Sequence, residues 1–173
     1  ATGDVIGLLH SDDYFAHTSV LEQIAGVFED PDLDIVYADA GFFSPRQPSR
    51  VIRRYNSGRF NASRIRNGWM PAHTTMYVRR KVFEQYGNYS KEFKIAADFE
   101  FIARTFSSGA SKSLYIPEIW MMMQTGGAST DGLKSKFLLN REVLKACRMN
   151  GIHTNYARLL SKYPEKLLEL VRR

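Results

Sequence analysis

Cysteine and long apolar runs are nearly absent from this chain of 173 residues. A single cysteine, Cys147, has no partner for a disulfide within the chain and suits a reducing compartment, so we expect a cytoplasmic protein. Its apolar neighbours predict a buried, unreactive thiol. No apolar run approaches the roughly 18 residues of a membrane-spanning helix. Hydrophobic residues still make up 44% of the chain, which provides a core and excludes a disordered class.

Positive charge is absent from the first part of the chain. Residues 1–45 hold nine acidic residues and no lysine or arginine, whereas residues 46–95 hold twelve basic residues and only two acids, Glu84 and Glu92. This separation could place a metal site opposite an anion site. It could instead reflect solvated surfaces of opposite sign, and the count of charges alone favours that simpler interpretation.

Short strands and a helix alternate along the first forty residues. The apolar run from Val5 to Leu9 is typical of a short buried strand. Ser19 and Glu22 form a capping-box pair at the start of an amphipathic helix. Residues 34–39, "DIVYAD", have the composition of a second strand. This order predicts a crossover unit in an α/β sheet that is mixed and flanked by helices.

The rest of the chain predicts further short elements. The proline- and arginine-containing stretch from Phe42 to Phe60 is expected to be irregular. The expected elements after it are a strand at residues 74–78, a helix at 81–86 ended by Gly87, a helix at 98–107, a strand at 114–116 closed by Pro117, and helices at 131–150 and 156–173. We therefore expect two parts, residues 1–130 and a helical extension at 131–173.

Two neighbouring carboxylates follow the first predicted strand. The run "VIGLL" ends in "HSDD", which places Asp12 and Asp13 at the carboxyl end of that strand. Ligands of open α/β sheets bind outside the carboxyl ends of the strands. Carboxylates suit Mg²⁺ or Mn²⁺, which take their remaining ligands from water and substrate phosphates. A turn capped by aspartate is the simpler explanation of so short a motif, so the motif alone leaves both interpretations open.

Several segments, taken in order, resemble one known family. They are "GDVIGLLHSDDYF", "VYAD", "NGWMPAHTTMYVRR", "IAADFEFIARTF" and "TGGAST". Their kind and spacing resemble family 2 glycosyltransferases of the GT-A fold, in particular bacterial members that build surface polysaccharides. The resemblance covers roughly residues 1–130. It departs at His10, the first position of the D-x-D-type motif, and at Ala97, where the family has glutamate.

The resemblance implies an inverting enzyme that moves a sugar from a nucleotide-diphosphate donor to a saccharide or lipid-linked saccharide acceptor. Asp12, with Asp13 as the second candidate, would hold Mn²⁺ or Mg²⁺ against the leaving diphosphate. Asp98 would be the general base for the acceptor hydroxyl, although a first-turn acid that stabilises its helix is the alternative. The implied substrate-binding residues are His73, Arg104, Gly126, Gly127 and Ser129.

Some of these residues have simpler explanations. His73 is as readily structural as it is a phosphate or acceptor contact. Gly126 and Gly127 suit a plain turn as well as a backbone anion site. Arg79 and Arg80 could grip a diphosphate, although at least one of them is expected to face solvent. Trp120, which precedes three methionines, is more typical of a core than of a sugar platform.

The same resemblance implies that the complete enzyme has a further, nucleotide-binding part. In the resembled family, an N-terminal half that precedes the metal motif holds the nucleotide base and ribose. We therefore expect this chain to be the metal and acceptor half of a larger enzyme and to bind nucleotide sugar weakly by itself. We also expect an unpaired sheet edge, which a homodimer could cover.

Two other classes of function are kept as alternatives. The basic stretch from Arg46 to Arg66, interleaved with Tyr55 and Phe60, is the pattern of a nucleic-acid-binding module, but the acidic first segment argues against a nucleic-acid partner. A non-catalytic dimerisation piece is the other alternative. The final segment "PEKLLELVRR" is compatible with peripheral contact at the inner face of the membrane, although an ordinary surface helix is the simpler explanation.

Overall fold

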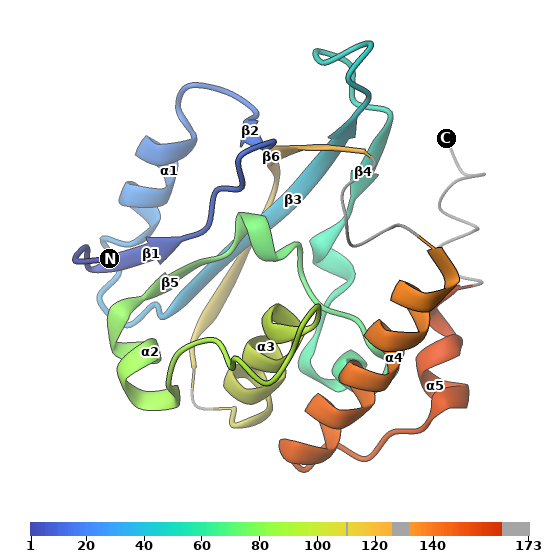
Figure 1. Ribbon diagram of the computed structural model, residues 1–173. Helices are drawn as coiled ribbons and strands as arrows, with labels where there is room; N and C mark the ends of the chain where they lie inside the picture. Colours follow the sequence, from blue (N-terminus) through green and yellow to red (C-terminus); the bar gives the residue numbers. More distant parts are fainter. Residues whose placement is uncertain (110, 126–131, 164–173) are drawn as a thin grey trace. The chain divides into compact units, whose positions relative to one another are not determined.

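The computed structural model describes residues 1–109, 111–125 and 132–163, which divide into two compact units (Figure 1). We name them the sheet unit, made of Ala1–Arg59, Pro71–Gly87 and Gly109–Thr125, and the helical unit, made of Phe60–Met70, Asn88–Ser108 and Gly126–Arg173. The predicted division near residue 130 falls outside the described ranges and stays a prediction. No helix in those ranges has the length and apolar character needed to cross a membrane.

The sheet unit is built on a six-stranded sheet. Its strands are β1 (Val5–Gly7), β2 (Tyr14–Phe15), β3 (Ile35–Phe43), β4 (Arg53–Tyr55), β5 (Tyr77–Arg79) and β6 (Ser113–Gln124). The order across the sheet is β1-β5-β3-β6-β2, and β4 pairs with β3. β3 and β6 run parallel, whereas the other pairs are antiparallel. A mixed sheet with helices α1 (Val20–Val27) and α2 (Arg80–Tyr86) confirms the predicted α/β class.

β1 differs from the buried strand that the sequence predicts. It pairs with β5 alone among the described residues, so it forms an edge of the sheet. The predicted strand continued through Leu9, but Leu8 and Leu9 follow its end and are exposed. Gly7 lets β5 approach, because a Cβ there would lie 2.3 Å from the ring of Tyr77. β1 and β3 run in the same direction, so the predicted crossover between them is confirmed. They are not direct neighbours, because β5 lies between them in the sheet.

β6 continues through the proline that was predicted to end it. The pairing with β3 shifts register between Ala38, which faces Ile116, and Asp39, which faces Ile119. Pro117 and Glu118 lie in this irregularity. A proline has no backbone N–H to donate to a neighbouring strand. It is tolerated at a bulge because the ladder hydrogen bonds are interrupted there. The strand therefore resumes at Ile119 and extends to Gln124.

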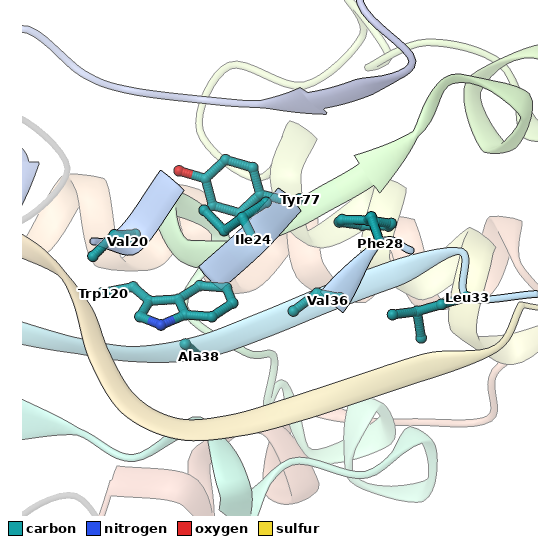
Figure 2. Close-up of a cluster of buried hydrophobic side chains, with 8 residues drawn as sticks. All are labelled: Val20, Ile24, Phe28, Leu33, Val36, Ala38, Tyr77 and Trp120. Carbon is teal, nitrogen blue, oxygen red and sulfur yellow. The ribbon is translucent and has the colours of Figure 1, made fainter. Parts of the chain in front are cut away.

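Helix α1 covers part of the sheet with a continuous apolar contact. Val20 and Ile24 of α1, and Phe28 at its C-terminal end, lie beside residues from β3, β5 and β6. Figure 2 shows the rings of Tyr77 and Trp120 close to the helix. The eight buried members are Val20, Ile24, Phe28, Leu33, Val36, Ala38, Tyr77 and Trp120. Trp120 is fully buried, and its indole N–H donates to Gln23 at 3.0 Å. The prediction that Trp120 belongs to the core is confirmed.

The expected capping box of α1 does not form. Ser19 is the N-cap residue, but its side chain makes no capping hydrogen bond. The Ser19 hydroxyl lies 2.9 Å from Nδ1 of His17 instead. Helix α2 behaves as predicted, because Gly87 ends it with a φ of 84°, a conformation that side chains with a Cβ rarely adopt.

Arg79 has a structural role at the end of β5. Its guanidinium donates to the backbone carbonyls of Phe28 and Leu33, both at 2.7 Å, and of Asp30 at 2.8 Å. These bonds tie β5 to the segment between α1 and β3. Arg80 likewise donates to the carbonyl of Gly3. These contacts occupy both guanidinium groups with backbone oxygens, which disfavours the predicted grip on a diphosphate.

A buried carboxylate holds the β4 segment against the sheet. Asp39 is wholly buried within β3. The sequence predicted that the strand ends at this residue, but β3 continues to Phe43. It accepts from Arg54 Nε at 2.6 Å, from the Ser57 amide at 2.7 Å and from the Tyr115 hydroxyl at 3.0 Å. The charge and hydrogen-bonding capacity of Asp39 are therefore satisfied. This network orders β4 and the turn at Ser57–Arg59, in a stretch that was predicted to be irregular.

The helical unit is built on α3 (Ala97–Ser107), α4 (Gly132–Met149), α5 (Tyr156–Leu160) and a 3₁₀ turn at Ala62–Asn67. The starts and types of α3 and α4 agree with the prediction to within one residue. Residues 164–173 lie outside the described ranges, so the prediction for that segment is untested. Cys147 is fully buried in α4, and burial, partly opposed by the charge of Lys162, raises the pKa of its thiol to about 11, as expected of an unreactive residue.

Glu142 of α4 anchors the start of α3. Its carboxylate accepts from three consecutive amides, those of Lys94, Ile95 and Ala96, each at 2.9 Å. Burial raises the pKa of Glu142, but these three donors and the charge of Lys145 outweigh burial and lower the pKa below its usual value. The anchor fixes the backbone immediately before Asp98.

Replacing this anchor should destabilise the helical unit. Because Glu142→Ala leaves three amides without their acceptor, we expect it to lower the free energy of unfolding by about 2–3 kcal/mol. The lowered pKa means that the contribution of Glu142 is complete above the normal pKa of 4.5 and is lost as pH falls through the folded-state value. Denaturant titrations from pH 7 to pH 3 check both points. The exposed Glu84→Gln is the control, and an equal loss in both variants would contradict the anchoring role.

Candidate functional site

The turn that carries Asp12 and Asp13 lies between two strands of the sheet unit. It follows the carboxyl end of β1 and leads into β2, and the Asp13 amide donates to the His10 carbonyl at 3.2 Å. β2 pairs with the end of β6 through Tyr14 and Met122. This places the acidic turn beside the last residues of β6. Asp12 is exposed, whereas Asp13 is half-buried.

A second turn, at His73–Thr75, precedes β5. The sequence predicted that residues 74 and 75 belong to the strand, but the strand begins at Tyr77. Both threonines are buried, and the Thr75 hydroxyl lies 2.7 Å from the carbonyl and 3.1 Å from the amide of Ala38. The Thr74 hydroxyl lies 3.4 Å from the sulfur of Met123. These contacts fix the backbone of the turn against β3 and β6, with His73 half-buried on it.

The two turns bring His10 and His73 together. Their Nε2 atoms lie 3.3 Å apart, and the rings meet edge to face with centroids 5.5 Å apart. In the sequence, His10 stands out only as a departure from a motif, so this contact was not predicted. The antiparallel register of β1 and β5, which pairs Gly7 with Tyr77, would have indicated it, because the histidines follow and precede those residues by a few positions.

Asp13 is the residue of this cluster whose charge is least well satisfied. Burial and the neighbouring charge of Asp12 raise the pKa of Asp13, although His10, a hydrogen bond from the Gln124 backbone and His73 lower it in part. One carboxylate oxygen, Oδ2, is buried and has no hydrogen-bond partner among the described residues. An unpaired buried carboxylate oxygen is costly, and such groups in native proteins call for an explanation.

A divalent cation would satisfy that oxygen. Asp13 and Asp12 together provide hard oxygen ligands of the kind that Mg²⁺ and Mn²⁺ prefer. Within residues 1–109, 111–125 and 132–163, no three or more His, Cys, Asp or Glu side chains are arranged as a complete metal site. A cation here would therefore take its other ligands from water or from a bound phosphate, as magnesium does at nucleotide sites. The donor set fits such an ion.

Asp98 lies in the first turn of α3, in the helical unit. It is half-buried, and its Oδ1 accepts from the Phe99 amide at 2.7 Å. Its charge acts on Tyr89, because burial and Asp98 together raise the pKa of that phenol to about 12. The tyrosine therefore stays neutral, and Asp98 occupies a helix start, where an acidic residue is favourable. Its predicted catalytic role is neither required nor opposed by these contacts.

Arg104 is held within the helical unit by a buried carboxylate. Its guanidinium donates through Nε and one terminal nitrogen to the two oxygens of Glu100, both at 3.0 Å. The terminal nitrogen also donates to the Asn88 carbonyl at 3.0 Å. The ion pair is four residues apart on α3 and most of it is buried. These contacts position Arg104 firmly, and its predicted binding of substrate stays a prediction.

The remaining predicted site residues, Gly126, Gly127 and Ser129, are outside the described residues, and the turn predicted for them stays a prediction. The nucleic-acid alternative relied on Tyr55 and Phe60 as stacking platforms. Phe60 is buried and Tyr55 is half-buried, which leaves little aromatic surface for stacking on a base.

Comparison with known proteins finds solved structures with a similar fold. No protein-family model matches the chain, and no curated protein sequence matches it. Solved structures of the glycosyltransferase TarS from S. aureus are similar. Residues 1–349 of TarS with UDP-GlcNAc superpose with a TM-score of 0.57 at 15% identity, over 84% of this chain and 43% of that one. The complex of the same TarS residues with UDP superposes with a TM-score of 0.55 at 15% identity, over 84% of this chain and 41% of that one.

The fold is that of a glycosyltransferase domain. At 15% identity, the likeness shows the fold alone. The chain spans less than half of the length of the TarS structures that it resembles. The activity, donor and acceptor of the whole protein are therefore matters for proposal.

The unsatisfied charge of Asp13 predicts a stability effect of unusual sign. Because burial raises its pKa, ionised Asp13 costs folding free energy at neutral pH, and this cost is relieved as pH falls through the folded-state pKa toward the ordinary value of 3.8. We expect Asp13→Asn to have a higher melting temperature than the wild type at pH 7, and we expect this difference to shrink as pH falls through the folded-state pKa of Asp13 toward 3.8. Calorimetry on both proteins measures the difference. The exposed Asp4→Asn is the control, and a melting temperature lowered by Asp13→Asn would contradict the assignment.

Proposed function

We propose that this chain contributes the metal and acceptor part of an inverting glycosyltransferase that uses a nucleotide-diphosphate sugar. The observation that carries the proposal is the buried, unpartnered Oδ2 of Asp13 beside Asp12, His10 and His73. A glycosyltransferase-type fold is the natural setting for such a carboxylate, because the leaving group of the reaction is a diphosphate. The resemblance to family 2 of the GT-A fold, noted from the sequence, supports the finer assignment.

Asp13 and Asp12 would hold Mn²⁺ or Mg²⁺ in this account. The sequence register favoured Asp12 as the metal ligand, whereas the enclosed and unsatisfied oxygen belongs to Asp13, so we assign the principal contact to Asp13. When bound, the ion neutralises the charge that develops on the leaving diphosphate. His10 and His73 lie next to these carboxylates, and His73 is the proposed contact for the donor phosphates or the acceptor.

The donor is proposed from the chemistry of the cluster and from the fold. A nucleoside diphosphate completes the coordination of a cation that two carboxylates hold only in part. TarS has been crystallised with UDP-GlcNAc and with UDP, so a UDP-sugar is the first donor to examine. The acceptor is a hydroxyl of a saccharide or lipid-linked saccharide in cell-surface polysaccharide synthesis. A homodimer that covers β1, the edge strand, belongs to the same proposal.

Asp98 is the proposed general base. It is a half-buried carboxylate at the start of α3, where Glu142 fixes the three preceding amides of residues 94–96. Removal of the acceptor proton at Asp98 as the oxygen attacks the anomeric carbon, opposite the leaving diphosphate, inverts that centre. The proton is then held on the Asp98 carboxyl until it passes to solvent. Arg104, held by Glu100 on the same helix, is the proposed substrate contact.

Variants of the full-length gene product test this division of roles. We expect Asp98→Asn to lower kcat for sugar transfer by about 10²–10⁴-fold, because general-base catalysis contributes factors of that size. The affinity for UDP in the presence of Mn²⁺ should change by less than about twofold, since Asp98 is not assigned to the metal. Radiolabelled transfer assays and calorimetry measure the two quantities.

Asp13→Asn should behave in the opposite way and weaken Mn²⁺-dependent binding of UDP. Glu84→Gln, on the exposed side of α2, is the control for both variants. Transfer by Asp98→Asn at a rate near that of the wild type would refute the base. Binding of UDP that is independent of both Mn²⁺ and Asp13 would refute the metal site.

A further inference from the structure

The outer face of helix α4 carries a stripe of four basic side chains and one phenylalanine. Lys134, Phe137, Arg141, Lys145 and Arg148 follow one another at intervals of three or four residues, so they share one face of the helix. All five are exposed. We name these five residues the cationic stripe. At a rise of about 1.5 Å per residue, it is roughly 21 Å long.

Acidic side chains do little to neutralise this stripe. The one acid of α4, Glu142, is buried, and its carboxylate oxygens already accept from the three amides before α3. Lys145 pairs with Glu92 at 2.7 Å. The other three cations, Lys134, Arg141 and Arg148, form no ion pair with any described residue. The outer face therefore carries a net positive charge in a fixed arrangement.

Apolar side chains accompany the charges. Phe137 lies within the stripe and is 67% exposed, and Met149, which follows its last residue, is 53% exposed. Beside the middle of the stripe is a hollow of roughly 330 Å³, lined by Glu92, Lys94, Leu138, Arg141, Glu142 and Lys145. Its lining combines three cations with two carboxylates and Leu138, so the hollow adds little net charge, and the attraction for an anionic partner comes from the stripe itself.

We propose that the cationic stripe of α4 docks the protein on the surface of an anionic phospholipid membrane. Side chains on one face of a straight helix can all reach a plane at once, and each basic residue near an anionic bilayer adds to the attraction. Phe137 would enter the headgroup region, where burial of an aromatic ring is favourable. The proposal rests on α4 alone and is independent of the proposed sugar transfer.

A nucleic acid fits the stripe less well. Proteins that bind single strands without sequence preference line a basic groove with successive aromatic rings, on which the bases stack. The cationic stripe offers one ring, Phe137, and a convex helix face in place of a groove. Binding to an oligonucleotide is therefore the outcome that the experiment must distinguish from binding to lipid.

Vesicle co-sedimentation with matched charge variants tests the proposal. The wild-type chain should bind vesicles of phosphatidylglycerol and phosphatidylcholine in equal parts, lose that binding in high salt, and ignore pure phosphatidylcholine. Lys134→Gln with Arg141→Gln should lower the partition coefficient about 30-fold, roughly fivefold for each basic residue. Arg46→Gln with Arg50→Gln removes the same charge from the exposed β3–β4 connection of the sheet unit and should change it by less than about twofold.

Tryptophan fluorescence provides a second measurement. Trp69 and Trp120 are both buried, so Phe137→Trp adds a single exposed indole to a constant background. Its emission should shift to shorter wavelength when vesicles containing phosphatidylglycerol are added. Three results would overturn the proposal: no binding to these vesicles, equal losses in the two charge variants, or tighter binding to a single-stranded oligonucleotide than to vesicles at the same salt concentration. Circular dichroism of each variant confirms that it is folded.

Discussion

The pairing of β3 with its neighbours on both sides is the constraint on which the candidate site depends. β3 is buried along almost all of its length, with β5 antiparallel on one side and β6 parallel on the other. β5 in turn holds β1. Because of these pairings, the turn before β5, the turn after β1 and the last residues of β6 meet, although they come from distant parts of the sequence. His73, Asp13 and Gln124 are brought together in this way.

A comparison with two other carboxylates, Asp39 and Glu142, shows how unusual Asp13 is. Asp39 is paired with Arg54 and two further donors, and Glu142 accepts from three amides. Both stabilise the fold by closing a connection between elements. Asp13 has a buried oxygen without a donor and a like charge beside it, and its pKa is raised as a result. A group that opposes folding in this way is better explained by a ligand than by structure.

The sequence predicted the elements whose signals are local. The apolar faces of α1 and α3, the glycine after α2 and the α/β class were all predictable, because they depend on neighbouring residues. Apart from the capping box of α1, where Ser19 contacts His17, the errors concern features that depend on distant partners. Pro117 does not end β6 because a bulge opposite Ala38 and Asp39 accommodates it, and β1 is an edge because β5 separates it from β3. The contact between His10 and His73 was missed for the same reason: it follows from strand register, which the sequence does not specify.

The central claim, that the acidic turn after β1 binds a divalent cation, can be tested directly by nuclear magnetic resonance. The chain has four histidines. His10 and His73 lie at the proposed site, whereas His17 lies beside Ser19 and Glu118, and His153 belongs to the helical unit. Titration with Mn²⁺ broadens the signals of nearby nuclei. The account predicts that the imidazole signals of His10 and His73 broaden first, and that Asp13→Asn abolishes this. Equal broadening of all four histidines, or selective broadening of His17 or His153, would contradict it.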